Sequence, residues 1–383
     1  MKVVILGNYS RNLVVFRGAV IRELVDRGHE VIAVGPENDA WTAQGLRALG
    51  ATFVVIPMAR ASLNPFGDVV YMMRVSRLLS LHRPHAVITF THKPNTIGAL
   101  ASVCLGHHPA IVQLVEGLGY SFIDVDGFRK HLANLITRLL YRVSFRFSSH
   151  VLFLNESDRQ IFESAGLFPP QLSVEVLDGI GIDLERFSPT PVPFRPFTFL
   201  IVARLLRTKG LAEFCLAAKQ VKVRYPEVCF VIVGAPDPSR DGFSLLDLQQ
   251  YQDEGTVRWI EQTNDIERLY RECSVYVLPS YREGAPVTVM EAMASGRPVI
   301  TTDVPGCRTT VTHGYDGIIV PPKDPEALAG AMLDLLSSPA RVRELGAAAR
   351  MTAERRFDSR RQSRHQVAAV EVAVHRRMMA TKR

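Results

Sequence analysis

The stretch KVVILGNYSRNLVVFRGAVIRELVDRGHEVIAVGP, residues 2–36, decides the fold. A short apolar, β-branched run ends in a glycine, residues 12–28 show a helical spacing of apolar positions, and a second apolar run follows. Strand, turn, helix and strand form the beginning of a βαβ unit. Because the strands are apolar throughout rather than alternating, we predict a parallel sheet with helices on both faces.

Apolar runs of this kind continue along the chain in two series. The first comprises residues 51–58, 85–92, 110–119 and 149–166, the last passing from a strand into a capped helix. The second comprises residues 197–204, 228–235, 257–262, 274–280, 297–304 and 316–322. A proline-rich segment, 188–196, separates them. We therefore predict an α/β chain of two doubly wound, Rossmann-like domains, residues 1–190 and 191–364, with a C-terminal helix of about residues 365–383 that can pack back on the first.

The composition limits the class of protein. With 47% hydrophobic and 22% charged residues among 383, the chain has the make-up of an ordinary globular protein. Its net charge of +7 favours a polyanionic partner, namely nucleic acid, anionic lipid or a phosphorylated substrate. The five cysteines are scattered without a C-x-x-C pair, which argues against a zinc site and fits a reducing compartment. We see neither an uncharged run of ~18 residues nor a signal peptide, and expect a cytoplasmic protein.

Ligands of open α/β sheets bind beyond the carboxyl ends of the strands, so the loops after strands should carry the chemistry. Arg204 lies just past a predicted strand, and Lys209 comes shortly before a predicted helix, residues 211–221. Two cations and a helix N-terminus at such a turn can bracket a diphosphate. The alternative is a pair of solvated surface cations. Gly234 ends the next strand, where a missing side chain would let a ligand approach the backbone.

The segment YREGAPVTVMEAMASG, residues 281–296, holds two glutamates, Glu283 and Glu291. On one helix they would lie about 80° and about 12 Å apart, a poor geometry for a shared task. Pro286 suits a first helical turn, so we predict a helix from Pro286 to Ser295, ended by Gly296, with Glu283 in the preceding loop. Glu291 could then reach a ribose diol near the helix N-terminus, and Glu283 the group on the distal phosphate. The plainer alternatives are a surface loop acid and a helix acid favoured by the dipole.

Together, Arg204, Lys209 and the E-x7-E spacing of Glu283 and Glu291 resemble the signature of the retaining GT-B glycosyltransferases of family 4, in which two Rossmann-like domains face each other across a cleft. The resemblance extends through DGIIVPPKDPEAL, residues 316–328. It implies that Arg204 and Lys209 stabilise the departing diphosphate, that Glu291 binds the ribose and that Glu283 contacts the donor sugar. Further donor contacts are expected from Gly7, Asn8, Gly234, Gln262, Gly284, Ala285, Pro286 and Val287.

Segments in the first half of the chain resemble a smaller group within this family. RASLNPF (60–66), THKPNTIG (91–98), LVEGLGYSFID (114–124) and LNESD (154–158) are similar to segments of the bacterial enzymes that extend undecaprenyl-diphosphate-linked glycans. Within that group the chain most resembles the α-1,3-N-acetylgalactosaminyltransferases.

These loops are suited to an acceptor site. His92 and Lys93 follow a predicted strand and, with Asn95 and Tyr120, are expected to contact the acceptor. Glu116 ends another strand, where a carboxylate could accept a proton from the acceptor hydroxyl or hydrogen-bond the donor sugar. The alternative for His92 is a structural histidine.

Two short motifs suggest other chemistry. Asp124 and Asp126 form a D-x-D pair like the metal motif of the other main glycosyltransferase fold, but Arg204 and Lys209 can supply the same charge. The first glycine turn, residues 7–12, lacks the G-x-G-x-x-G pattern of a dinucleotide site. We therefore predict neither a metal nor a cofactor.

The segment FRKHLANLITRLLYRVSFRFSSH, residues 128–150, is basic and contains no acid. It mixes leucine, isoleucine, tyrosine and phenylalanine with the cations Arg129, Lys130, Arg138, Arg142 and Arg146, as an interfacial amphipathic helix does. The alternative is a helix packed on the sheet with an arginine-rich outer face. We expect peripheral association with the inner face of the membrane.

The expected function is transfer of an N-acetylhexosamine, GalNAc by resemblance, from a UDP donor to an undecaprenyl-diphosphate-linked sugar, with retention at the anomeric carbon. Three alternatives stay open. A family-4 enzyme with a soluble acceptor would need no membrane, and a GT-B nucleotide-sugar epimerase would need no acceptor. A nucleic-acid-binding protein would explain the net charge, but no basic–aromatic motif or recognition helix supports it.

Overall fold

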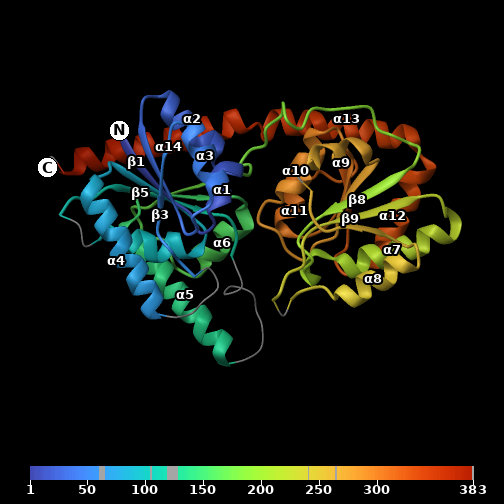
Figure 1. Ribbon diagram of the computed structural model, residues 1–383, viewed down its shortest axis with the longest axis horizontal. Coiled ribbons are helices and arrows are strands. Elements are labelled where there is room, and N and C mark those ends of the chain that lie inside the picture. The colour runs from blue at the N-terminus through green and yellow to red at the C-terminus, as the bar shows by residue number, and fades with distance from the viewer. Residues whose placement is uncertain (60–64, 104–105, 119–127, 240, 264, 382–383) are drawn as a thin grey trace. The chain divides into compact units, whose positions relative to one another are not determined.

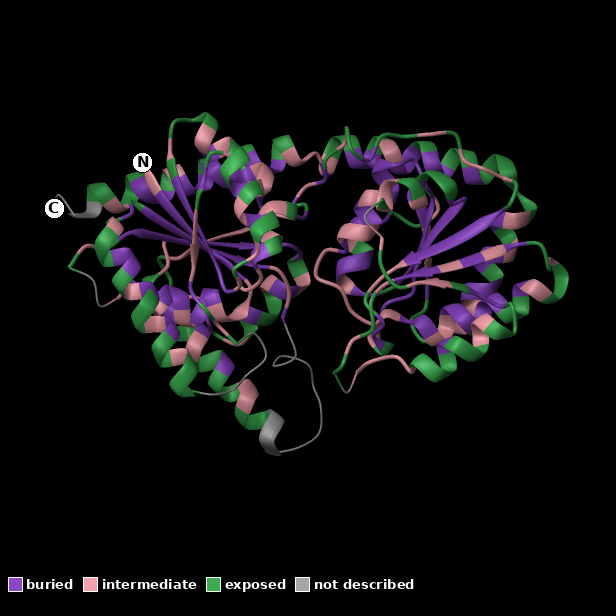
Figure 2. Ribbon diagram, viewed as in Figure 1, coloured by how far each residue is buried: buried purple, intermediate pink, exposed green. Residues whose placement is uncertain are grey.

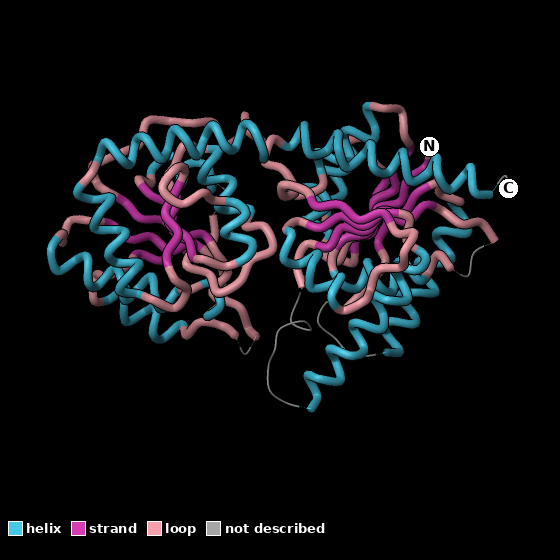
Figure 3. Tube along the Cα trace, turned by 180° about the vertical axis from the view of Figure 1, so that it is seen from behind, coloured by secondary structure: helices cyan, strands magenta, loops and turns pink. Residues whose placement is uncertain are grey.

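The computed structural model describes residues 1–59, 65–103, 106–118, 128–239, 241–263 and 265–381. The chain forms two compact units: unit 1 comprises Met1–Ile180 and Arg360–Arg383, and unit 2 comprises Gly181–Ser359. Each unit contains a parallel sheet with helices on both faces (Figures 1 and 3). The predicted class, two doubly wound α/β domains, is confirmed.

The sheet of unit 1 has seven strands in the order β3-β2-β1-β4-β5-β6-β7, with every pair parallel. The strands are β1 (Lys2–Leu6), β2 (Glu30–Gly35), β3 (Thr52–Val55), β4 (Ala86–Phe90), β5 (Ala110–Val115), β6 (His150–Phe153) and β7 (Ser173–Val176). Its helices are α1 (Ser10–Val15), α2 (Gly18–Asp26), α3 (Ala40–Ala48), α4 (Pro65–His82), the π-helix η1 (Pro94–Gly98), α5 (Phe128–Phe147), α6 (Glu156–Ser164) and α14 (Ser359–Thr381). The central strands are buried along most of their length, as apolar runs require (Figure 2).

The prediction of a single helix over residues 12–28 is wrong, because the segment forms two helices, α1 and α2. The backbone N–H groups of Phe16 and Arg17 both donate to the carbonyl of Asn12, at 3.0 and 3.2 Å, so the first helix closes there. Arg17 becomes the N-cap of α2 and its side chain is buried. The break thus turns an arginine inward.

The sheet of unit 2 has six parallel strands in the order β10-β9-β8-β11-β12-β13. The strands are β8 (Thr198–Val202), β9 (Cys229–Val233), β10 (Arg258–Ile260), β11 (Val275–Leu278), β12 (Val299–Thr302) and β13 (Gly317–Val320). Its helices are the 3-10 helix η3 (Arg207–Lys209), α7 (Leu211–Arg224), α8 (Leu245–Asp253), α9 (Ile266–Glu272), α10 (Val287–Ala294), α11 (Pro305–Thr310), α12 (Pro325–Ser337) and α13 (Pro339–Arg356). One large apolar cluster fills both faces of this sheet.

The last helix, α14, follows unit 2 in the chain but belongs to unit 1. Its Glu371 carboxylate accepts from Arg27 at 2.8 Å and contacts His29 at 3.1 Å, and its Val367 and Val370 are buried. In the part of the chain that the structure describes, neither this helix nor any other is both long and apolar enough to cross a bilayer.

Candidate active site

Lys209 is held at the carboxyl edge of the unit 2 sheet by a tight turn. It ends η3, and Gly210 follows with a left-handed φ of 73°. A Cβ at Gly210 would lie 2.0 Å from the carbonyl oxygen of Pro279, just past the end of β11, so a glycine is required there. This close approach brings the loop after β8 against the loop after β11.

Lys209 and Glu283 form an ion pair across these two loops. The ammonium Nζ donates to Oε1 of Glu283 at 2.5 Å, and the hydroxyl of Ser280 donates to the same oxygen at 2.6 Å. The side chains are 23% and 11% exposed, so each charge is largely shielded while part of the lysine faces solvent. A charge-assisted hydrogen bond of this kind fixes both side chains before any ligand binds.

The predicted helix after Glu283 is confirmed as α10, with Pro286 as its N-cap and Gly296 in a left-handed conformation, φ 73°, after its end. As a proline, Pro286 offers no side-chain hydrogen bond to the first turn, and Gly210 at the N-cap of α7 offers none either. The free N–H groups of these turns suit an anion. Gly284, Ala285 and Val287 are partly exposed around this helix start.

Glu291 lies deeper in unit 2. Its carboxylate accepts a hydrogen bond from the hydroxyl of Tyr270 at 2.9 Å. Burial raises the pKa of Glu291 to about 7, and the Tyr270 hydrogen bond and the charge of Arg186 oppose this rise only in part. Arg186 itself is ion-paired with Glu267. The structure therefore places Glu283 and Glu291 in different surroundings, and their separate roles towards a ligand stay a prediction.

Arg204 is more exposed than Lys209. Its side chain is 69% exposed and pairs with Asp237 at 2.9 Å. Asp237 also accepts hydrogen bonds from Ser239, and these bonds, followed by the charge of Arg204, hold the pKa of Asp237 below its ordinary value. Gly234, in the same loop region, is required by packing, because a Cβ there would lie 1.8 Å from the Ala203 carbonyl oxygen. Gln262 is exposed after β10.

The predicted acceptor residues of unit 1 have partners of their own. Lys93 Nζ donates to Asp68 of α4 at 2.6 Å, and the His92 ring packs on Tyr141 of α5, with centroids 5.3 Å apart. Burial, and then the charge of Lys93, lower the pKa of His92, which favours its neutral form. The residue before it, Thr91, has a φ of 69°, a strained conformation for a β-branched side chain.

Asn95 is fully buried, and its side chain forms hydrogen bonds to two neighbouring strands. Its amide donates to the carbonyl of Leu114 at 2.8 Å and its oxygen accepts from Thr89 at 2.7 Å. These bonds connect the ends of β4 and β5 with η1. This geometry gives Asn95 a structural task, and contact with an acceptor stays a prediction.

Glu116 follows β5 and accepts a hydrogen bond from the buried side chain of Arg17. At the end of β1, the N–H of Gly7 donates to the Val34 carbonyl at 2.9 Å, and a Cβ at Gly7 would lie 3.1 Å from the ring of Phe90. The side-chain oxygen of Asn8 is buried and has no hydrogen-bond partner within the described residues. Glu116, Gly7 and Asn8 thus share the carboxyl edge of the unit 1 sheet.

Two predictions lie outside the described residues, namely Tyr120 as an acceptor contact and the Asp124–Asp126 motif. Within the residues that are described, no group of three His, Cys, Asp or Glu side chains could hold a metal ion.

The sequence prediction missed the residues that support the site. Ser280 binds Glu283, Asp237 binds Arg204, Tyr270 binds Glu291 and Arg17 binds Glu116. Ser280 and Asp237 carried a usable signal, since Ser280 ends one predicted strand and Asp237 closely follows another. Arg17 carried none, because an arginine within a helical pattern is typical of a solvated face.

The sequence is similar to known glycosyltransferases along most of its length. Residues 14–177 match the model of the glycosyl transferase 4-like domain, and residues 185–352 match that of the glycosyl transferases group 1. The N,N'-diacetylbacillosaminyl-diphospho-undecaprenol alpha-1,3-N-acetylgalactosaminyltransferase of Campylobacter jejuni is 33% identical over 86% of this chain and 88% of its own length. The UDP-Gal:alpha-D-GlcNAc-diphosphoundecaprenol alpha-1,3-galactosyltransferase of Escherichia coli is 24% identical over 73% of each chain.

Among solved structures, HepE of Anabaena in complex with UDP matches with a TM-score of 0.77 at 19% identity, over 97% of this chain and 100% of HepE. The two parallel α/β units have the GT-B fold. With its two family matches and its Campylobacter relative, the chain belongs to the group 1 glycosyltransferases. It is an enzyme of the hexosyltransferase type.

The raised pKa of Glu291 makes stability depend on pH. The folded protein keeps the proton up to about pH 7, whereas the unfolded chain releases it near the ordinary value of 4.5. Between these values the folded state binds more protons, so the free energy of unfolding falls as pH rises. Glu291→Gln removes this loss, and we expect the variant to gain on the order of 3 kcal/mol relative to wild type between pH 4.5 and pH 8.

Urea unfolding at several pH values measures this difference. The control is Glu272→Gln, which alters a side chain that is 57% exposed and should leave the pH slope unchanged. Parallel stability curves for wild type and Glu291→Gln would contradict the prediction.

Proposed function

We propose that the chain transfers an N-acetylhexosamine, GalNAc, from a UDP donor to an undecaprenyl-diphosphate-linked sugar, with retention of the anomeric configuration. The main support for binding of a nucleotide-sugar donor is the preformed Lys209–Glu283 ion pair at the carboxyl edge of the unit 2 sheet. The sugar and the lipid are suggested by the printed name of the Campylobacter relative, and UDP by the HepE complex.

The donor would bind to unit 2 through its charges. A diphosphate suits Lys209, the exposed Arg204 and the N-terminal turns of α7 and α10. Glu283 would accept hydrogen bonds from the donor sugar, since Lys209 and Ser280 hold one of its two oxygens and leave accepting capacity on the carboxylate. Glu291 would accept from the ribose hydroxyls.

The acceptor would bind to unit 1. Asp68 neutralises Lys93 in the free protein, so an acceptor diphosphate must compete with Asp68 for that ammonium. Glu116, whose side chain is 29% exposed, can receive the proton of the attacking hydroxyl.

The proposed course of the reaction follows from these roles. Negative charge grows on the diphosphate as its bond to the sugar breaks, and Lys209, Arg204 and the helix termini stabilise that charge. The acceptor hydroxyl attacks from the face that the diphosphate leaves, which preserves the anomeric configuration.

A donor panel tests this function directly. UDP-GalNAc, UDP-GlcNAc, UDP-Gal, UDP-Glc and a GDP-sugar, each radiolabelled, are incubated with undecaprenyl-diphospho-monosaccharide, and transfer to lipid is measured. We expect UDP-GalNAc to be used, and Lys209→Ala and Glu283→Ala each to lose about 100-fold or more, as when a preorganised transition-state contact is removed.

The control is Lys219→Ala on α7, which alters a surface lysine paired with Glu254 at 2.7 Å. Full transfer by both site variants would refute the proposed site. Transfer only to water-soluble acceptors would favour a soluble-acceptor enzyme, and donor conversion without an acceptor would favour an epimerase.

We also propose that unit 1 contacts the membrane surface through α5 and α4. Helix α5 exposes Leu132, Leu135, Ile136 and Leu139, which are 48–64% exposed. Helix α4 exposes Phe66, Val69 and Met73, which are 49–81% exposed. Both helices pack on η1, which is the second part of the predicted acceptor segment, residues 91–98. Apolar side chains among arginines suit an anionic lipid surface, where each cation contributes about 1 kcal/mol.

Leu135→Glu/Leu139→Glu tests this contact. Each leucine that enters the lipid contributes about 1.5–3 kcal/mol, so the variant should bind vesicles of phosphatidylglycerol and phosphatidylethanolamine more weakly by at least about tenfold. Binding is measured by co-sedimentation at low salt. The control is Val223→Glu, a substitution in unit 2 at a side chain that is 84% exposed. Equal sedimentation of the two variants would contradict membrane contact through these helices.

A further inference from the structure

The break between α1 and α2 places a positive charge inside unit 1. The Arg17 side chain is 4% exposed, and its Nη2 donates to Oε1 of Glu116, whose side chain is 29% exposed. Arg17 lies between α1 and α2, the two helices that follow β1, and Glu116 follows β5. A buried cation therefore reaches a carboxylate that is open to solvent.

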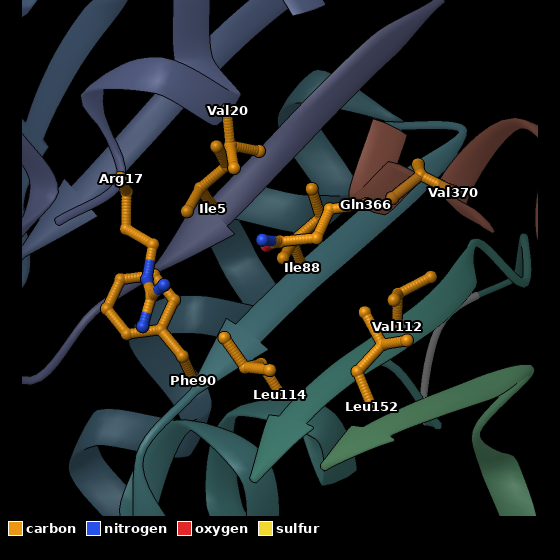
Figure 4. Close-up of a pocket in the computed structure, with 10 residues that line it drawn as sticks. All are labelled: Ile5, Arg17, Val20, Ile88, Phe90, Val112, Leu114, Leu152, Gln366 and Val370. Atoms are coloured by element: carbon orange, nitrogen blue, oxygen red, sulfur yellow. The ribbon is translucent and has the colours of Figure 1, made fainter. Parts of the chain in front are cut away.

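The surroundings of Arg17 are apolar. Its guanidinium lies 4.5 Å from the centroid of the Phe90 ring, and Figure 4 shows the two groups stacked beside a small cavity. That cavity is lined mainly by apolar side chains, among them Ile5, Val20 and Ile88. Burial lowers the pKa of Arg17 to about 9, as expected for a cation removed from water. Attraction between opposite charges is stronger in such surroundings than in water.

Phe90 and Gly7 together support the position of Arg17. Phe90 supports one face of the guanidinium, and the absence of a side chain at Gly7 leaves the space that the Phe90 ring fills. Gly7 thus has a packing reason for being glycine: it supports the stack that aims Arg17 at Glu116.

Stability alone accounts poorly for this arginine. Its Nε and Nη1 atoms are buried and have no hydrogen-bond partner within the described residues. Unsatisfied buried donors are costly, and an apolar side chain of similar length could pack on Phe90 without that cost. Among the described residues, the charge of Arg17 is used in its cation–π contact with Phe90 and in its bond to Glu116, and only the second reaches a group that is open to solvent.

We propose that Arg17 is a positioning residue, which holds the Glu116 carboxylate ionised and oriented to receive the proton of the acceptor hydroxyl. This inference rests on the proposed function. As the hydroxyl oxygen bonds to the anomeric carbon, the bond from that carbon to the diphosphate breaks, and UDP leaves with the electron pair. The hydroxyl proton passes to Glu116, and Arg17 keeps its own protons throughout.

Arg17→Met tests the role, because methionine can fill the site and pack on Phe90 without a charge. We expect kcat to fall by about 10- to 100-fold while the Kd for UDP is unchanged; this is less than the about 100- to 10,000-fold that general base catalysis contributes, because Glu116 itself remains. The acidic limb of the kcat/KM profile should move to higher pH, because a carboxylate that loses a neighbouring cation ionises less readily. Arg17→Lys, which keeps the charge, should recover much of kcat and return the limb towards wild type.

Glu116→Gln completes a double-mutant cycle. If Arg17 acts through Glu116, then Arg17→Met combined with Glu116→Gln loses no more activity than Glu116→Gln alone. Arg22→Met, an exposed position on the same helix, is the control. Urea unfolding checks that each variant is folded.

Wild-type kcat and an unmoved pH profile in folded Arg17→Met would overturn the inference, and so would additive losses in the cycle. Both results leave the proposed function intact. Lack of transfer by the wild type would instead refute the proposed function itself.

Discussion

The pairing of parallel strands is the constraint on which both halves of the molecule depend. Hydrogen bonds between β8 and β11 align Phe199 with Val275 and Leu200 with Tyr276. Since both strands run the same way, the loops after them emerge at one edge, and Lys209 meets Glu283 although 74 positions separate them in the chain. In unit 1, the pairing of β4 with β5 brings Phe90 and Glu116 to one edge in the same way.

Each unit then places one charged pair in a shielded position at that edge. In unit 2 the cation is the more exposed member, since Lys209 is 23% and Glu283 11% exposed. In unit 1 the order is reversed, with Arg17 at 4% and Glu116 at 29%. A partly exposed ammonium can bind an anion, and a partly exposed carboxylate can accept a hydrogen bond from a hydroxyl. The unit 2 pair therefore presents a positive charge to a ligand, and the unit 1 pair presents a negative charge.

Much of the fold could be predicted because its signals are local. Uninterrupted apolar runs indicated the buried strands, and Pro286 and Gly296 set the ends of α10 within a residue or so. The break at Phe16–Arg17 could not be predicted, because there Arg17 contacts Phe90 and Glu116, which are far away in sequence. The strand β7 was missed since its four residues, Ser173–Val176, are only partly buried and mix polar with apolar side chains. For the site, the strand ends indicated which residues to examine. They did not indicate that the side-chain amide of Asn95 is already hydrogen-bonded to Leu114 and Thr89.

Because α14 belongs to unit 1, the chain passes from one unit to the other twice, after Ile180 and after Ser359. The two ends of unit 2 are joined to each other, because the N–H of Ser359 donates to the carbonyl of Ile182 at 2.9 Å. During synthesis, unit 1 must therefore wait for the whole of unit 2 before its last helix leaves the ribosome. The unit whose translation begins first is completed last, and until then Val20 and Ile88 lack the α14 side chains Gln366 and Val370 that line the same cavity.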